Sequence, residues 1–217
     1  MNTLTSAPLA PLLYKLFDEA AATRPMLQEY SSEDRRRLMG SKTEYRELYA
    51  RLKDVWLPVS PQTGVLLYML ARSTRATNIV EFGTSFGIST LYLAAALRDN
   101  GGGRLITTEF EPSKIVRARE HLAQGGLLDL VDIREGDALQ TLRVDLPDAI
   151  DLLLLDGAKA LYPDILGLLE SRLRPGALIV ADNADDSPEY LKRVRSPDSG
   201  YLSVPFEEDV ELSMRLG

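Results

Sequence analysis

Short apolar segments alternate with amphipathic helical segments between residues 78 and 181, and this alternation constrains the fold more than any other feature of the chain. The expected strands are Asn78–Phe82, Arg104–Thr108, Val131–Arg134, Asp151–Leu155 and Ala177–Ala181. The helical segments between them are Ser89–Arg98, Pro112–Gln124, Asp137–Leu142 and Tyr162–Leu173. A repeated strand–helix order predicts a parallel sheet with helices on both of its faces.

Helices are expected before this alternation and a hairpin after it. Within residues 9–57, apolar residues recur near helical spacing. These residues are Leu38, Tyr45, Leu48, Tyr49, Leu52 and Val55. Residues 62–72 predict a further buried helix, and the strand-like runs Tyr201–Pro205 and Val210–Leu216 predict a closing hairpin.

We therefore expect one domain over residues 1–217, with N-terminal cap helices in 1–57 and an α/β core in 58–217. The core is predicted to be a Rossmann-like, doubly wound sheet of seven strands with an antiparallel last strand. The hydrophobic content of 45% and charged content of 26% agree with a folded globular domain.

The net charge of −7, without a long basic run, argues against nucleic acid or an anionic membrane as a partner and leaves a small-molecule substrate. The chain has no apolar run of the roughly 18 residues that span a bilayer. It also begins without a basic segment before a hydrophobic one, so we expect a cytoplasmic location.

The chain has no cysteine and one histidine, His121, which we expect to face solvent on a charged helix. This composition excludes disulfides, a thiolate nucleophile, an iron–sulfur cluster and a zinc site built from cysteines or several histidines. A bound metal would be held mainly by oxygen atoms, which favours Mg²⁺, with Mn²⁺ or Ca²⁺ as alternatives.

The first expected strand leads into a glycine-containing turn over residues 81–89. Gly83 and Gly87 would let the backbone approach a ligand at the carboxyl end of the sheet. Ser85 stands where the dinucleotide fingerprint has its second glycine, so a pyrophosphate would have poor access. The turn therefore favours a nucleoside cofactor without phosphates.

The next two strand ends extend this prediction. Glu109 ends the second strand, where a carboxylate can accept hydrogen bonds from both ribose hydroxyls. Gly136, Asp137 and Ala138 follow the third strand, where an adenine ring would lie. Either glycine or Glu109 alone would favour an ordinary strand-to-helix turn, but their combination and order favour a nucleoside site.

Acidic residues follow the fourth and fifth strands: Asp156, with Lys159 beyond it, and the pair Asp182 and Asn183. Two carboxylates and an amide oxygen, completed by water and substrate, suit an octahedral cation. As alternatives, each aspartate is a common helix cap or turn residue, and Lys159 a common surface residue. The combination, without competing cysteine ligands, favours a metal site.

These segments together resemble the cation-dependent O-methyltransferases, which include the catechol and caffeoyl-coenzyme A O-methyltransferases and their bacterial relatives. The resemblance covers roughly residues 58–195. Its motifs lie in Val80–Thr90, Leu105–Glu109, Gly136–Ala138, Leu154–Asp164 and Arg174–Asn183. It implies methyl transfer from S-adenosylmethionine to a hydroxyl of a catechol-type vicinal diol, assisted by a divalent metal, and by analogy a homodimer.

The resemblance also implies roles for individual positions. The residues implied to contact the cofactor are Val59 or Ser60, Glu81, Gly83, Thr84, Ser89, Glu109, Asp137, Ala138 and Asp156. Asp156, Asp182 and Asn183 would hold the metal, and Lys159 would be the catalytic base if the metal and burial lower its pKa. A cation would also stabilise the phenolate, which at a pKa near 10 is scarce at neutral pH.

Three positions receive more modest predictions. Ala158 stands where many relatives carry an aspartate or a tryptophan, which leaves that wall of the acceptor site smaller. Trp56 is expected to pack in the core. Residues 207–209, which are Glu207, Glu208 and Asp209, are expected to form a solvated hairpin tip.

Three other functions are open to a chain with these features. A metal-independent methyltransferase acting on nitrogen, carbon or an isolated hydroxyl would keep activity in a strong chelator. A non-catalytic nucleoside-binding protein would bind the cofactor without turnover. An NAD-dependent oxidoreductase is disfavoured by Ser85 and the missing pyrophosphate turn.

Overall fold

The computed structural model describes residues 2–23, 25 and 40–217. In the N-terminal region it contains α1 (Leu9–Thr23) and α3 (Tyr45–Arg51), followed by α4 (Pro61–Ser73). The helical prediction for residue 24 and residues 26–39, Leu38 included, lies outside the described residues. Residues 52–57 also belong to the region 9–57 that was predicted to be helical, but they form no helix. A turn and a bend over 52–55 lead into an irregular segment that ends at Ser60, whose hydroxyl accepts the Thr63 amide at the start of α4.

The predicted seven-stranded sheet is confirmed, with the strand order β3-β2-β1-β4-β5-β7-β6. The strands are β1 (Asn78–Phe82), β2 (Arg104–Glu109), β3 (Val131–Glu135), β4 (Ile150–Leu155), β5 (Leu173–Ala181), β6 (Tyr201–Phe206) and β7 (Val210–Arg215). Strands β1 to β5 are parallel, and the last strand, β7, runs antiparallel to both of its neighbours.

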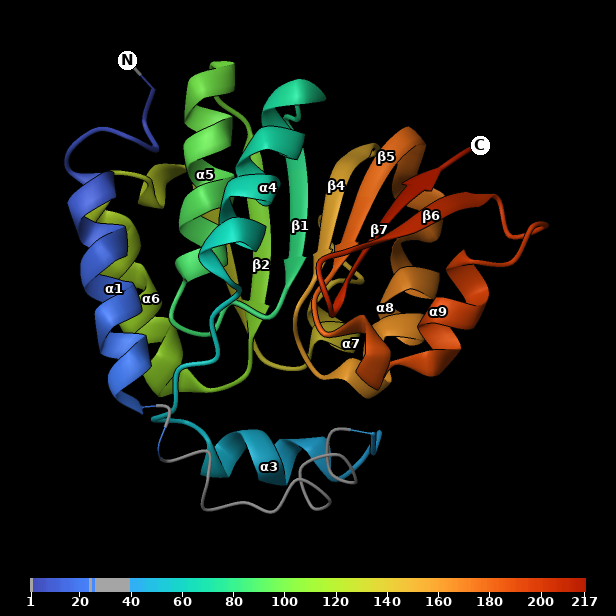
Figure 1. Cartoon of the computed structure of the whole chain (residues 1–217), viewed down its shortest axis with the longest axis horizontal. Helices are drawn as coiled ribbons and strands as arrows, with labels where there is room; N and C mark the ends of the chain where they lie inside the picture. The colour runs from blue at the N-terminus through green and yellow to red at the C-terminus, as the bar shows by residue number, and fades with distance from the viewer. Residues whose placement is uncertain (1, 24, 26–39) are drawn as a thin grey trace.

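Helices cover both faces of the sheet (Figure 1). One apolar core packs α1 and α4 together with α5 (Ile88–Asn100) and α6 (Pro112–Gln124). The core on the opposite face packs α7 (Ala138–Thr141), α8 (Tyr162–Leu169) and α9 (Pro188–Val194). Among the described residues, no helix has the length and apolar character needed to cross a membrane.

The prediction was wrong at two places, before and after β5: the boundary between α8 and β5, and the helix α9. The helix expected to run to Leu173 ends at Leu169, and after a short turn Leu173 is already the first residue of β5. The helix α9 was not predicted, because only seven residues form it and its stability comes from burial of Tyr190 and Val194 rather than from a long apolar period.

The register of β1, β4 and β5 places Asp156 and Asp182 next to each other at the carboxyl ends of these strands. Phe82 of β1 pairs with Leu155 of β4, and Leu155 pairs with Ala181 of β5. Backbone hydrogen bonds continue one residue further, from the amide of Asp156 to the Phe82 carbonyl (2.8 Å) and from the amide of Asp182 to the Leu155 carbonyl (2.9 Å). The two aspartates therefore lie side by side where parallel strands end.

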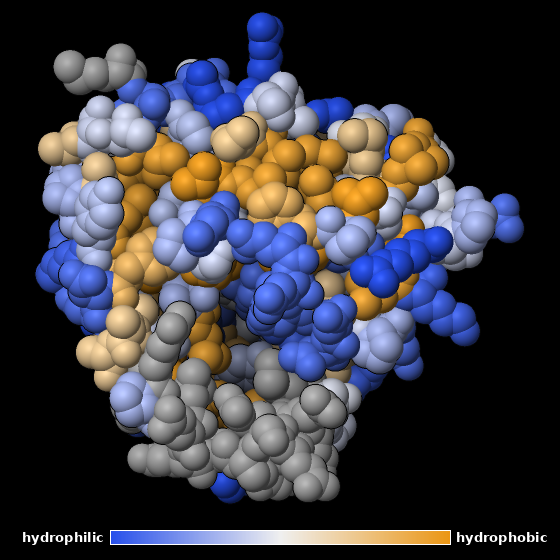
Figure 2. Space-filling model, in the orientation of Figure 1, coloured by the Kyte–Doolittle hydropathy of each residue, from blue (hydrophilic) through white to orange (hydrophobic). Residues whose placement is uncertain are grey.

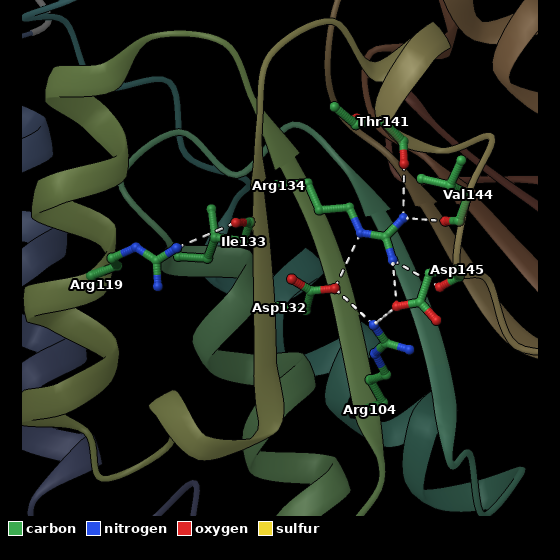
Figure 3. A network of polar contacts seen from close by, with 8 residues as sticks. All are labelled: Arg104, Arg119, Asp132, Ile133, Arg134, Thr141, Val144 and Asp145. Carbon is green, nitrogen blue, oxygen red and sulfur yellow. Dashed lines mark hydrogen bonds and ion pairs between the residues drawn. The ribbon is translucent and has the colours of Figure 1, made fainter.

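A polar network holds the connection between α7 and β4 against the edge of the sheet (Figure 3). Arg134 of β3 donates to the carbonyl oxygens of Thr141, Val144 and Asp145, at 2.7, 2.7 and 2.8 Å. Its Nε also donates to Asp132 at 3.1 Å, and the Arg134 side chain is only 11% exposed. This guanidinium thus ties the end of α7 and the start of the connection to β3.

We expect Arg134→Met to lower the free energy of unfolding by about 2–3 kcal/mol, because three carbonyl groups and a carboxylate lose a charged donor. Urea unfolding at pH 7 measures the change. Arg143→Met is the control, since this exposed side chain donates to one carbonyl oxygen, that of Leu139. Equal effects of the two substitutions would contradict the importance of the network.

Candidate active site

A cavity of about 570 Å³ opens at the carboxyl ends of the parallel strands, beside α3. Figure 2 shows one face of the molecule, which has hydrophobic side chains over its upper part and a hollow below them, next to hydrophilic side chains. The lining includes α3, the segment before α4, and the residues that follow β1, β2, β3, β4 and β5. Every strand end singled out in the sequence thus contributes to one cavity.

The residues predicted to contact a nucleoside lie together at the cavity: Glu109, Gly136, Asp137 and Ala138 all line it. Backbone amides orient the Glu109 carboxylate: that of Ser85 donates to one oxygen, at 2.8 Å, and those of the next two residues donate to the other. Asp137 accepts a hydrogen bond from the Leu139 amide and so caps α7, which begins at Ala138. Glu109 retains oxygen lone pairs that ribose hydroxyls can use.

The glycine turn brings two strand ends into close contact. Gly83 has φ of +107°, and a Cβ at that position would lie 2.6 Å from the carbonyl oxygen of Asp156, so only glycine fits. The hydroxyls of Ser85 and Thr108 line the cavity and have no hydrogen-bond partner among the described residues. Such unpaired buried hydroxyls fit a cavity that receives a polar ligand.

Three of the predicted cofactor residues lie just behind the cavity wall. Glu81 is fully buried and accepts hydrogen bonds from Ser89 Oγ, at 2.6 Å, and Thr90 Oγ1, at 2.7 Å. Thr84 shares a 2.6 Å hydrogen bond with Thr107, and both Thr84 and Ser89 line a small recess next to the cavity. Glu81 thus anchors the turn from behind and is not among the residues that line the cavity.

Burial raises the pKa of Glu81 from 4.5 to about 7 despite its hydroxyl donors. The folded state therefore binds this proton more tightly than the unfolded state, and stability falls as pH rises from 4.5 through 7. We expect Glu81→Gln to raise the free energy of unfolding by up to about 3 kcal/mol at pH 8, with a gain that shrinks toward pH 5.

Urea unfolding of this variant at pH 8 and pH 5 tests the expectation. Glu120→Gln, at an exposed position on α6, controls for general charge effects. A change of the same size at both pH values would show that ionisation of Glu81 is not its cause.

The cavity also receives Asp156, Asp182 and Asn183. The Nδ2 of Asn183 donates to Asp209 at 2.8 Å, so its Oδ1 is the amide atom left for another partner. Burial, followed by the charge of Asp156, raises the pKa of Asp182 to about 8. No group of three or more His, Asp or Glu residues suited to a metal occurs in the described part of the chain, so a cation here would need the Asn183 oxygen as its third protein ligand.

Lys159 is buried beside these carboxylates. Its Nζ donates to Asp156 Oδ1 at 2.9 Å and to the Tyr162 hydroxyl at 2.8 Å, and Tyr162 in turn donates to the carbonyl of Asp182. Burial opposes the charge on Lys159, but Tyr162 and Asp156 outweigh it and raise its pKa well above the ordinary value. The role of base predicted for Lys159 depends on a pKa lowered by a bound cation, and the protein groups around Lys159 shift its pKa in the opposite direction.

Aromatic side chains pack beside the glycine turn. Trp56 stacks on Phe86 with ring centroids 4.2 Å apart, and both rings approach the cofactor turn. His121, which we expected to face solvent, is 5% exposed, stacks on Trp56 and hydrogen-bonds the Phe86 carbonyl through Nδ1 at 2.8 Å. The residues next to His121 in the sequence are largely charged, and this led to the wrong prediction that His121 faces solvent.

The predicted N-terminal contacts are shifted along the chain. Val59 is buried in the core and Ser60 caps α4, whereas Trp56, Leu57 and Pro58 line the cavity. The hairpin tip is exposed, as predicted, but it also reaches the site, since Asp209 accepts from Asn183. Neither contact has a local signal in the sequence.

Comparison with known proteins gives consistent matches. The sequence profile of a family described as "Methyltransferase domain" matches residues 80–184. A catechol O-methyltransferase of Niastella koreensis is 38% identical over 130 residues, which cover 58% of this chain and 58% of that protein. Catechol O-methyltransferase B of Danio rerio is 32% identical over 171 residues, 75% of this chain and 64% of that protein. The chain thus spans 58% to 64% of the length of these two relatives.

Solved structures agree in fold. The O-methyltransferase TomG of Streptomyces achromogenes, in complex with SAM, has a TM-score of 0.68 and 28% identity and covers 77% of this chain and 86% of its own. Cofactor-bound Rv0187 from MTB has a TM-score of 0.71 at 21% identity, covers 98% of this chain and 93% of its own, and supports the fold alone.

Proposed function

We propose that the chain is a class I S-adenosylmethionine-dependent O-methyltransferase, because it matches the methyltransferase-domain profile and resembles catechol O-methyltransferases and a solved O-methyltransferase. We propose that it transfers a methyl group from S-adenosylmethionine to a hydroxyl of a small aromatic vicinal diol. We propose further that a divalent metal assists, with Mg²⁺ preferred and Mn²⁺ or Ca²⁺ as alternatives. A homodimer and a cytoplasmic location stay predictions.

One observation carries this proposal: Glu109 and the group formed by Asp156, Lys159 and Asp182 line the same cavity. Glu109 suits a ribose, and the second group suits an acceptor oxygen that must lose a proton. Joining a nucleoside site to a proton-accepting site is what methyl transfer from a sulfonium to a hydroxyl requires.

The residues of the chain then have separate tasks. The glycine turn and Glu109 would hold the cofactor, while Asp137 and Ala138 border its adenine end. Lys159 would take the proton of the acceptor hydroxyl, held in place by its hydrogen bonds to Asp156 and Tyr162. The α3 side of the cavity, with Tyr49 donating to the Gly157 carbonyl at 3.4 Å, would limit the entry of water.

The donor set of Asp156, Asp182 and the Asn183 amide oxygen fits a hard cation. A cation bound there supplies charge that stabilises the acceptor phenolate and offsets the carboxylate charge that keeps the proton on Lys159. Burial, followed by the charge of Asp156, raises the pKa of Asp182, and a cation bound there would offset both effects.

The decisive experiment incubates the protein with S-adenosylmethionine, Mg²⁺ and a panel of catechols and records a mass gain of one methyl group. We expect product with vicinal diols and none after treatment with a strong chelator, restored by added Mg²⁺. Activity that survives the chelator would favour a metal-independent methyltransferase. Cofactor binding without product from any diol would remove the proposed acceptor class.

A further inference from the structure

Lys114, in the first turn of α6, is a cation of the cavity wall with no role in the proposed function. It is 4% exposed and lines the same cavity as Glu109 and Asp156. Its ammonium lies 5.2 Å from the centroid of the Phe86 ring. It forms no hydrogen bond or ion pair with any residue that the structure describes.

Among the residues that the structure describes, two other cations line the cavity, and each is paired. Lys159 donates to Asp156 at 2.9 Å, and Arg46 donates to Asp137 at 2.7 Å. The Phe86 ring gives the Lys114 ammonium a cation–π contact but no oxygen acceptor. A buried ammonium without a hydrogen-bonded partner is unfavourable, so such a lysine at a cavity wall indicates a ligand group that supplies the acceptor. Next to Lys114 we therefore expect a ligand group that accepts hydrogen bonds from its ammonium.

A simpler interpretation is that Lys114 only offsets the negative charge around it. Glu109, Glu111, Asp54 and Asp156 attract the ammonium from beyond 4.0 Å, yet the net effect of burial is to lower the pKa of Lys114. Attraction at that range leaves the N–H groups without acceptors. A carboxylate placed in the cavity would satisfy both the charge and the hydrogen bonds.

We propose that Lys114 binds a carboxylate group of a ligand in this cavity. The inference rests on the proposed function, whose two ligands give two sources: the methionine part of the cofactor, or an acceptor diol that bears an acid group. Phe86, next to Lys114, also lines the recess formed with Gly83, Thr84 and Ser89, where the methionine part is predicted to lie. Both sources are thus within the same region of the site.

Calorimetric titration of the wild-type protein and Lys114→Met distinguishes them. The first pair of probes is S-adenosylhomocysteine and its decarboxylated analogue, which keeps the amine. The second pair is 3,4-dihydroxybenzoate and catechol, titrated into protein that holds S-adenosylhomocysteine and Mg²⁺. We expect Lys114→Met to weaken the carboxylate member of one pair by about 10-fold to 100-fold and its partner by less than about threefold.

Three controls accompany the titration. Lys114→Arg keeps the charge and should retain most of the preference for the carboxylate. Lys15→Met removes an exposed lysine of α1 and should change no affinity. Thermal unfolding should show that Lys114→Met is folded, because removing an unpaired buried charge does not destabilise a protein.

The pair that responds identifies the source of the carboxylate. Equal changes in both members of both pairs would overturn the inference while leaving the proposed function standing. Failure of the wild-type protein to bind S-adenosylhomocysteine would instead overturn the proposed function, and the inference with it.

Discussion

Replacing Lys159 with methionine is expected to lower kcat for methyl transfer by about 10²-fold to 10⁴-fold, the usual contribution of a general base. Methionine keeps an unbranched stem of similar length in this buried position but has no atom that takes a proton at neutral pH. The Kd of S-adenosylhomocysteine should change by less than about threefold, because Lys159 contacts the acidic end of the cavity and not Glu109.

Single-turnover kinetics with a catechol, together with calorimetric titration, measures both quantities. Lys192→Met is the matched control, since it removes the same charge from an exposed position in the last turn of α9. A Lys159→Met variant that retains more than about a tenth of the wild-type kcat would contradict the role of base.

Asp182→Asn is expected to raise the Mg²⁺ concentration needed for half-maximal activity by more than about 100-fold. Loss of an outer partner of a metal ligand already costs about 10-fold to 100-fold in affinity, and Asp182 is proposed to be a direct ligand. Asparagine has nearly the same shape and removes a carboxyl whose pKa is raised to about 8, so the metal-free fold should not be weakened at neutral pH.

Titration of activity with Mg²⁺ from nanomolar to millimolar concentrations tests this expectation. Asp185→Asn, three residues away at an exposed position, is the control for the loss of one negative charge. If Asp182→Asn and wild-type protein respond to Mg²⁺ at the same concentration, Asp182 is not a metal ligand.

The alternation of apolar and helical segments was sufficient to predict the strands. Predicted and observed strands agree within a residue or two for β1 to β4, because their hydrophobic pattern is a local property with turns on either side. The prediction was wrong where two elements follow each other without a helix-breaking residue. Only Glu170, Ser171 and Arg172 lie between Leu169 of α8 and Leu173 of β5, and none of the three is a glycine or proline that would mark the end of the helix.

The candidate site shows the same division. Asp156, Asp182, Asn183 and Glu109 were identifiable because the carboxyl ends of parallel strands meet at one edge of a sheet, and all four line the cavity. Glu81 was predicted from the same motif, yet it lies behind the wall with Ser89 and Thr90. A motif places a residue in the chain, but packing determines the side to which its carboxyl points.

By itself, the sequence determined the order of the elements, the metal-compatible chemistry and the strand ends where it would gather, since these follow from local periodicity and residue type. Only the tertiary structure decided that Tyr162 holds Lys159, that His121 packs inward on Trp56, and that Lys114 lines the cavity without a hydrogen-bond partner in the described part of the chain. The physical reason is that each of these contacts joins a side chain to a neighbour chosen by helix rotation and packing against the sheet, which residue spacing along one segment does not specify.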